Sequence, residues 1–339
     1  MFPRGQTDRR VTKASASVGA IQMNEHGGAD RLVWSHVNLP PPGPGEVQIR
    51  HTAIGVNFVD INHRKGTYPI DLPAIPGREA AGIVTAVGRG VRNLLPGQRV
   101  AYCLPPGGAY CEARNYPAAF LVPLPDSITD VQAAAMMLKG LTAACLLLYA
   151  HRIKRGETIL IHAAAGGVGA IACQWAKSLG AIVIGTVGSD EKAAFARAHG
   201  CDHAIVYTRE NIVDRVREIT GGRMVSTVYD SIGRDTLLSS IDCLRRQGTL
   251  VWFGVASGRP QSLDPNLLAK ASLTMTWAAL VDHVKTRGAL LRTARALFDV
   301  VASGAVRVDI GGRYALKDAA EAQRDMEARL VMGSLVLIP

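Results

Sequence analysis

The sequence predicts an α/β protein in which a doubly wound parallel sheet is inserted into a mostly antiparallel, partly open barrel domain. Three observations support this fold class. An apolar strand runs into a glycine-rich turn at residues 158–169, and strand-like and helix-like segments alternate from there to about residue 278. The first 130 residues instead carry short strand-like runs separated by Pro and Gly turns. Alternation is typical of parallel sheets, whereas short strands with frequent turns are typical of antiparallel barrels.

The turn within residues 158–169 predicts a dinucleotide site. The preceding strand, Thr158–Ala163, is continuously apolar or β-branched, as a strand buried on both faces must be. The turn reads Ala164-x-Gly166-x-x-Gly169 and opens a helix with one apolar stripe. Small residues let the backbone approach a pyrophosphate, and the helix N-terminus holds its negative charge. The same pattern also occurs in plain tight turns, but here the strand, the helix and a following strand are all present.

The remaining elements of the parallel sheet follow at regular intervals, and several of the helices are closed by glycine. The expected strands are 181–187, 203–207, 224–231, 249–254 and 273–278, and the expected helices are 191–199, 210–220 and 234–247.

The barrel domain is expected to come from both ends of the chain. Its early strands are predicted at 46–56, 80–87, 98–102 and 119–123, and its late strands at 306–309, around Tyr314 and at 334–338. Helical stretches at 130–151 and 284–303 connect the two parts. We therefore expect the barrel to comprise residues 19–138 and 282–339, the dinucleotide domain residues 139–281, and residues 1–18 to form a disordered extension.

Composition favours a soluble, cytoplasmic protein. The chain has 339 residues, 48% hydrophobic and 19% charged, with no apolar run of the roughly 18 residues needed to span a bilayer. Met1–Ser17 lacks the apolar core of a signal peptide, and a transit peptide is disfavoured because the segment is not amphipathic. The six cysteines show no metal-ligand spacing. The net charge of +10 is scattered among acidic residues, which disfavours nucleic-acid binding.

Several motifs together resemble one known family. They are Asn57-Phe58-Val59-Asp60, Arg64-x-Gly66-x-Tyr68-Pro69, Pro76-Gly77-Arg78-Glu79-Ala80-Ala81-Gly82, Leu138-Lys139-Gly140-Leu141-Thr142, His162–Gly169, Tyr229-Asp230-Ser231-Ile232-Gly233, Phe253-Gly254, Gly333 and Leu337-Ile338-Pro339. From about residue 19 onward the chain resembles the zinc-independent, zeta-crystallin-like quinone oxidoreductases of the medium-chain dehydrogenase/reductase superfamily.

This resemblance implies a GroES-like catalytic domain, a Rossmann domain, a cleft between them and a homodimer paired through the last Rossmann strand. It also implies NADPH-dependent reduction of a quinone. Zinc enzymes of the superfamily would carry Cys at the position of Asn57 and His at that of Arg78. Without these ligands we expect no catalytic metal.

The cofactor is expected to be NADPH rather than NADH. The second strand ends at Gly188-Ser189 without the acidic residue that grips the ribose of NADH. Lys192 and Tyr207 stand where the family contacts the 2′-phosphate, although a solvated lysine and a strand-end aromatic are the ordinary alternatives. The cofactor-binding residues expected in full are Asn57, Asp60, Lys139, Thr142, Gly166, Gly167, Val168, Gly169, Gly188, Ser189, Lys192, Tyr207, Ser231, Phe253, Gly254 and Arg329.

The substrate site is expected around residues 62–68 and 277–283. Tyr68 is the best candidate to donate a hydrogen bond to a substrate carbonyl, with Asn57 as the second catalytic residue and Asn62 and Arg64 as further substrate contacts. Asn62 departs from the family, which often has tyrosine there. Two other functions remain open: reduction of the C=C bond of enones, alkenals or acrylate derivatives, and a zeta-crystallin-like structural or RNA-binding role.

Overall fold

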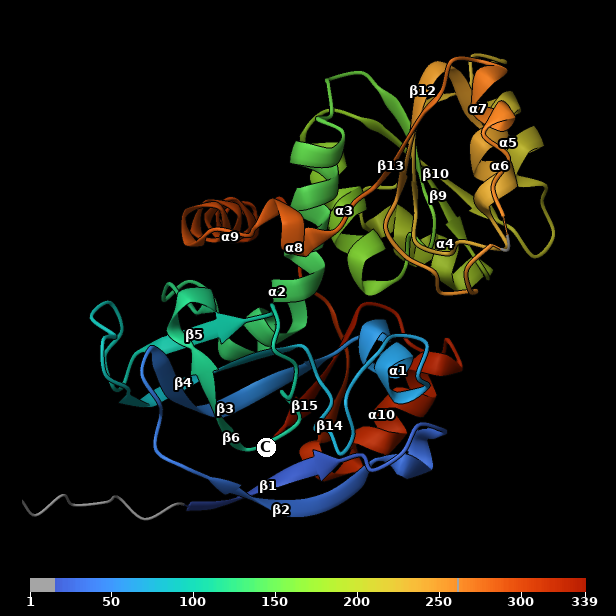
Figure 1. Ribbon diagram of the computed structural model, residues 1–339. Helices are drawn as coiled ribbons and strands as arrows, with labels where there is room; N and C mark the ends of the chain where they lie inside the picture. The colour runs from blue at the N-terminus through green and yellow to red at the C-terminus, as the bar shows by residue number, and fades with distance from the viewer. Residues whose placement is uncertain (1–15, 261) are drawn as a thin grey trace, which may run out of the picture.

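The computed structural model describes residues 16–260 and 262–339. A parallel sheet and a mainly antiparallel sheet form two bodies, with a long helix, α2 (Asp130–Ala144), between them (Figure 1). The predicted fold class is therefore confirmed. Residues 1–15 of the expected extension lie outside the described residues, whereas Ala16–Ser17–Val18 belong to strand β1.

The parallel sheet has six strands in the order β10-β9-β8-β11-β12-β13. Each lies close to its predicted position because the strands are buried, apolar runs. The strands are β8 (Thr158–Ile161), β9 (Ile182–Val187), β10 (His203–Val206), β11 (Val225–Asp230), β12 (Leu244–Trp252) and β13 (Thr274–Trp277). The helices are α3 (Gly167–Ser178), α4 (Asp190–Ala198), α5 (Ile212–Ile219), α6 (Leu237–Asp242) and α7 (Asn266–Ala269).

The predicted helix 234–247 is wrong at both ends. Helix α6 is shorter, and β12 already begins at Leu244, which pairs with Val225 of β11 before the register shifts. Leu244 is buried beside Ile241 in the same apolar cluster. Two buried apolar residues three positions apart are typical of one face of a helix, but here Ile241 belongs to α6 and Leu244 to β12.

The second sheet has seven strands, ordered β14-β15-β3-β4-β5-β7, with β6 paired to β3. They are β3 (Glu46–Val56), β4 (Glu79–Val87), β5 (Arg99–Tyr102), β6 (Ala113–Pro117), β7 (Val122–Pro123), β14 (Ile310–Ala315) and β15 (Ser334–Ile338). The C-terminal strand β15 pairs antiparallel with β3, so the end of the chain rejoins the barrel as expected. The expected strand 306–309 is wrong, since β14 starts only at Ile310, and 119–123 is reduced to β7.

Three features of the barrel side were not predicted. Strands β1 (Ala16–Gln22) and β2 (Val33–Leu39) form a separate antiparallel pair, and short helices α1 (Phe58–Arg64) and α10 (Ala319–Glu327) pack beside one another. Strand β2 mixes small, polar and apolar residues, and most of its side chains are half-buried or exposed. Its sequence therefore does not separate a buried face from a solvent face, which is the pattern by which a strand is predicted.

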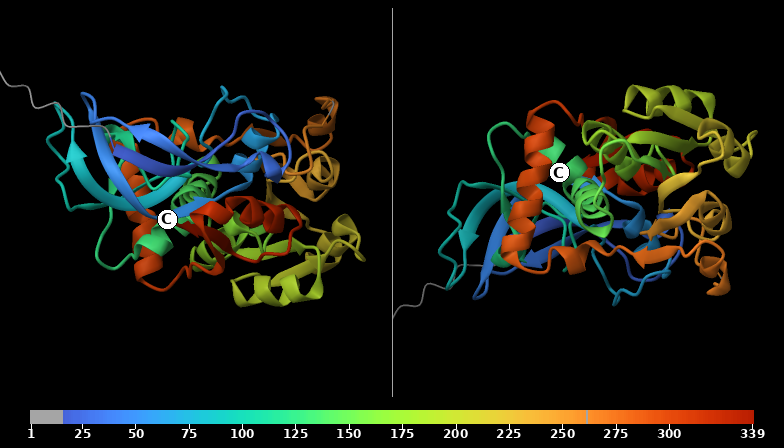
Figure 2. Two further views of the ribbon diagram at one scale, coloured as in Figure 1. Left: turned by 90° about the horizontal axis from the view of Figure 1, so that it is seen from below. Right: turned by 90° about the horizontal axis from the view of Figure 1, so that it is seen from above.

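Helix α2 continues as a π-helical turn, Cys145–Ala150, and α9 (Arg287–Ala302) packs across it (Figure 2). Gly140 permits this approach, because a Cβ there would lie 2.5 Å from Leu297 Cδ1. Among the described residues, Asp130–Ala150 is one helix long and apolar enough to cross a membrane, but 72% of its most apolar window is buried inside the protein. It is accordingly the core helix between the two sheets. The short helix α8 (Leu280–His283) packs against its π-helical turn.

Candidate active site

A cavity of about 960 Å³ lies between the two bodies, at the carboxyl ends of the parallel strands. Its walls come from the loop into α1, the start of α3, the ends of β9, β11, β12 and β13, and residues near the C-terminus. The sequence-predicted residues that line it are Asn57, Asn62, Tyr68, Lys139, Thr142, Gly166, Gly167, Val168, Gly169, Gly188, Lys192, Tyr207, Ser231, Phe253, Gly254 and Arg329. Residues 277–281 line it as well.

The glycine turn forms a tightly packed cradle along one side of this cavity. A Cβ at Gly169 would lie 2.2 Å from the Ala163 carbonyl oxygen, and one at Gly167 would lie 2.6 Å from Lys139 Cδ. Ala163 itself has φ 53°, and its carbonyl accepts the Gly166 N–H at 2.9 Å. The backbone thus comes close to the cavity at the N-terminus of a twelve-residue helix, a setting that fits a pyrophosphate.

A cationic and phenolic cluster closes one end of the cavity. Lys192 Nζ donates to the Arg329 carbonyl at 2.7 Å, and Arg329 Nη1 donates to the Tyr207 hydroxyl at 3.4 Å. Burial, and then the charge of Arg329, lower the pKa of Lys192. Because these two cations lie close together and neither forms a salt bridge within residues 16–260 and 262–339, the cluster suits a dianionic phosphate.

A buried carboxylate organises the opposite wall. Glu79 is fully buried and accepts hydrogen bonds from Lys139 Nζ (2.8 Å), Asn57 Nδ2 (2.8 Å) and the Leu138 N–H (2.6 Å). One N–H of the Asn57 amide is therefore committed to Glu79, which fixes the orientation of the amide at the cavity wall. Glu79 itself was a motif residue without an assigned role, because nothing in the sequence pattern reveals partners that lie 22 and 60 positions away.

The remaining part of the cavity presents the side chains of Asn62, His63 and Tyr68 together with the guanidinium of Arg78. Burial raises the pKa of Tyr68, so its phenol stays protonated and able to donate. Its ring lies edge-on to that of His63 at 6.0 Å, and burial together with the charge of Arg78 lowers the pKa of His63 to about 4. His63, Arg78 and Cys103 line the cavity but were not predicted as site residues.

Three predicted site residues do not line the cavity. Arg64 is 1% exposed and binds Gly27 O, Gln323 Oε1 and Glu327 Oε2, so it joins α1 to α10 rather than meeting a substrate. Asp60 is fully buried and accepts the Asn57 N–H at 3.0 Å and the Tyr110 hydroxyl at 3.1 Å. Ser189 caps α4 by accepting the Lys192 N–H. The structure thus places these three side chains in contacts within the protein rather than in the cavity wall.

Asp60 gives the protein a testable pH dependence. Burial raises its pKa from 3.8 to about 7, and its Oδ1 is buried without a hydrogen-bond partner among the described residues. The folded state therefore holds this proton more tightly than the unfolded state, and Asp60 contributes a loss of stability as pH rises from about 4 to 7. We expect Asp60→Asn to reduce the fall in the free energy of unfolding between pH 5 and pH 8 by about 2–3 kcal/mol, because roughly two pH units of this window lie below the raised pKa, at about 1.36 kcal/mol per unit.

This prediction is checked by urea denaturation of the wild type and Asp60→Asn at both pH values. The comparison isolates Asp60 because all other titrating groups are common to the two proteins. Parallel pH profiles for the two proteins would show that Asp60 is ionised throughout this range.

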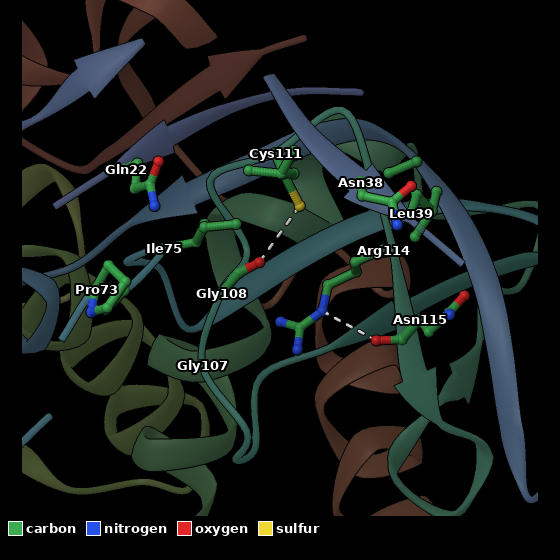
Figure 3. A pocket seen from close by; sticks show the side chains of 13 residues that line it. Gln22, Asn38, Leu39, Pro73, Ile75, Gly107, Gly108, Cys111, Arg114 and Asn115 are labelled. Atoms are coloured by element: carbon green, nitrogen blue, oxygen red, sulfur yellow. Dashed lines mark hydrogen bonds between the residues drawn. The ribbon is translucent and has the colours of Figure 1, made fainter. Parts of the chain in front are cut away.

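A second hollow of about 400 Å³ lies on the outer face of the barrel (Figure 3). Cys111 Sγ donates to Gly108 O and Arg114 Nε to Asn115 O, as the dashed lines show. The Arg114 guanidinium also stacks 5.0 Å from the centre of the Tyr116 ring. The Cys111 thiol and the Arg114 guanidinium are thus engaged within the protein. None of the predicted site residues lines this second hollow.

No cluster of three or more His, Cys, Asp or Glu side chains suited to a metal ion occurs in residues 16–260 and 262–339. In the cavity wall, Asn57 and Arg78 provide an amide and a guanidinium, and a guanidinium is a cation with no lone pair to offer a metal.

Comparison with known proteins gives a consistent result over most of the chain. Residues 43–126 match the family described as alcohol dehydrogenase GroES-like domain, and residues 167–295 match the family described as zinc-binding dehydrogenase. Quinone oxidoreductase 1 of Escherichia coli (strain K12) is 45% identical over 323 residues, covering 94% of this chain and 99% of that protein. A 2-haloacrylate reductase from a Burkholderia species is 44% identical over 330 residues, covering 95% and 99%.

Solved structures agree with these relatives. The crystal structure of Escherichia coli quinone oxidoreductase complexed with NADPH superposes with a TM-score of 0.93 at 44% identity, covering 95% of this chain and 100% of that one. The structure of a 2-haloacrylate reductase superposes with a TM-score of 0.86 at 45% identity, covering 95% and 99%.

Proposed function

Because the chain belongs to the quinone oxidoreductase family of the medium-chain dehydrogenases and reductases, we propose that it is an enzyme that reduces quinones with NADPH. The observation that carries this proposal is the single cavity in which a glycine turn, a phosphate-suited cluster and a protonated phenol all meet. A structural or RNA-binding role would require none of these three.

NADPH would lie along the carboxyl ends of the parallel strands. Gly166, Gly167 and Val168 would offer backbone N–H groups to the pyrophosphate. Lys192, Tyr207 and Arg329 would hold the 2′-phosphate, for which Lys192 would exchange its present carbonyl partner. At the other end the Asn57 amide would contact the nicotinamide half, with Lys139 and Thr142 beside it.

The bound cofactor supplies a hydride, and the protein supplies position and a dry environment. Phe253, Trp277 and the residues around Tyr68 would hold a flat, electron-poor ring against the nicotinamide. The Tyr68 phenol would donate a hydrogen bond to the substrate carbonyl as negative charge builds on its oxygen. Addition of a hydride to a quinone gives a hydroquinone monoanion, whose oxygen would take one proton from water, so in this mechanism neither a strong acid nor a metal ion is needed.

Reduction of a conjugated C=C bond is the second candidate function. The similarity to a 2-haloacrylate reductase favours it, at an identity close to that of the quinone oxidoreductases. A steady-state panel of NADPH oxidation with benzoquinones, naphthoquinones, ortho-quinones, 2-alkenals and 2-chloroacrylate separates the two. We expect a quinone to give the highest kcat/KM. A clear preference for an alkenal or for chloroacrylate would replace the proposal with C=C reduction.

Lys192→Ala should weaken NADPH binding by about 1–3 kcal/mol, the range of a charge-assisted contact, and leave NADH binding nearly unchanged. Titration of both cofactors against wild type and variant, followed by nicotinamide fluorescence, measures this difference. Lys270→Ala removes an exposed lysine at the end of α7, away from the cavity, and controls for net charge. Equal NADPH and NADH affinities in the wild type would contradict the assignment of the 2′-phosphate site.

We further propose a cytoplasmic homodimer paired through β13. This strand is an edge of the six-stranded sheet, so a second copy could extend the sheet there. All six cysteines are buried free thiols, in keeping with a reducing compartment. Sedimentation of wild type and Met275→Pro would test the pairing: the Ala278 N–H donates to Trp252 O of β12, so by alternation the Met275 N–H lies on the free edge, where proline removes it.

A further inference from the structure

Arg78 is a cation in the cavity wall that the protein leaves without an anionic partner. Its side chain is half-buried and lines the cavity, and its Nε is buried with no hydrogen-bond partner among the described residues. Arg64, Arg99 and Arg209 are each paired with a carboxylate, but Arg78 forms no such pair within the described part of the chain. A partly desolvated, unpaired guanidinium costs free energy, which a bound anion would offset.

The carboxylates near Arg78 are committed to other groups. Glu79 already accepts from Lys139, Asn57 and the Leu138 N–H. Asp60 is fully buried behind the wall, where it accepts from Asn57 N–H and the Tyr110 hydroxyl. The groups that share the cavity surface with Arg78 on the α1 side, Asn62, His63 and Tyr68, carry no negative charge at neutral pH. Asp235, a further carboxylate of the cavity wall, is paired with Arg234, so none of these carboxylates forms an ion pair with Arg78 and its guanidinium is open to an anion that enters the cavity.

The position of Arg78 separates this anion from the phosphates of the cofactor. The pyrophosphate and 2′-phosphate belong to the glycine turn and to the Lys192 cluster, on the parallel-sheet side. Arg78 instead precedes β4 in the barrel body, and its charge acts on His63 and Cys103 of the same wall. This is the part of the cavity assigned above to the substrate.

We infer that Arg78 is a specificity-determining residue that binds an anionic substituent, a carboxylate or sulfonate, on the quinone or enone substrate. This inference rests on the proposed function and deepens it. A planar guanidinium can hold such a group through two parallel N–H···O bonds, which a neutral quinone cannot accept in the same way. The enzyme then favours anionic over neutral substrates of equal size and reactivity.

The test compares two probes that differ by one anionic group, 1,4-naphthoquinone-2-sulfonate and 1,4-naphthoquinone. Equilibrium binding is followed without NADPH by quenching of tryptophan fluorescence, since Trp277 lines the cavity. We expect Arg78→Gln to weaken binding of the sulfonate at least tenfold and binding of the neutral quinone less than threefold. Arg78→Lys should retain part of the preference because it keeps the charge.

Two controls make the result specific. Arg259→Gln removes an exposed arginine whose charge also reaches Tyr68, and it should change sulfonate binding less than threefold. Unchanged NADPH binding by Arg78→Gln shows that the cavity is intact. An equal effect of Arg78→Gln on both probes, no effect on either, or an equal effect of Arg259→Gln would overturn the inference.

The two proposals fail separately. Quinone turnover by the wild type without any dependence of sulfonate binding on Arg78 rejects the role of Arg78 alone. Sulfonate binding that depends on Arg78, in a protein that reduces no quinone, rejects quinone reduction and retains the anion site.

Discussion

Glu79→Ala should lower the free energy of unfolding by about 3–5 kcal/mol, the usual cost of removing one partner of a buried ion pair. Lys139 is 5% exposed, and Glu79 is its ion-pair partner at 2.8 Å. Without the carboxylate, the Lys139 ammonium, the Asn57 amide and the Leu138 N–H would all lose their acceptor inside the wall. Turnover should fall as well, because the amide of Asn57 would no longer be held in one orientation.

Urea denaturation of the apoprotein measures the stability change, and a double variant shows its origin. In Glu79→Ala/Lys139→Met both charges are gone, so part of the lost stability should return. Asp235→Ala breaks an exposed pair with Arg234 and should cost less than about 1 kcal/mol. A loss in Glu79→Ala as small as that in Asp235→Ala would mean that water reaches Lys139.

The sequence predicted the parts of the fold that depend on local pattern. The glycine turn and the six parallel strands were predicted because continuous β-branched runs are typical of strands buried on both faces, and a run of small residues after such a strand is typical of a tight turn. The helix at 234–247 failed because Ile241 and Leu244 are buried at helical spacing in two different elements. The pair β1–β2 was missed because β2 has little contrast between its faces.

In the candidate site, too, the residues that follow from local sequence pattern were predicted, and those that depend on distant partners were not. Residues adjacent to the glycine turn and to strand ends were predicted in the cavity wall, since parallel strands bring their carboxyl ends together. Arg64 stands in a family motif, yet Gln323 and Glu327, more than 250 positions away, turn it into the barrel side. Glu79 and Arg78 acquire their meaning only from what surrounds them in space. Glu79 accepts hydrogen bonds from three donors, whereas Arg78 has no ion-pair partner among the residues that the structure describes.

Gly169→Ala is the second substitution with a large expected effect. A Cβ there would lie 2.2 Å from the Ala163 carbonyl oxygen and 2.8 Å from Ala164 Cα. Both are backbone atoms, which cannot rotate away as a side chain could, so the turn itself must move. We expect a stability loss of about 1–3 kcal/mol and, because a displacement of about 1 Å misaligns the pyrophosphate N–H groups, a loss of NADPH affinity on the order of 100-fold.

Urea denaturation and NADPH titration of Gly169→Ala give the two quantities independently. Gly288→Ala is the matched control: its Cβ would meet only the flexible end of Arg292, at 3.3 Å, within helix α9. Alanine favours a helix over glycine by about 1 kcal/mol, so this control should keep or slightly raise stability and leave NADPH affinity unchanged. A Gly169→Ala variant that is stable and binds NADPH like the wild type would place the pyrophosphate away from this turn, because the backbone atoms of Ala163 and Ala164 cannot make room for the Cβ unless the turn moves.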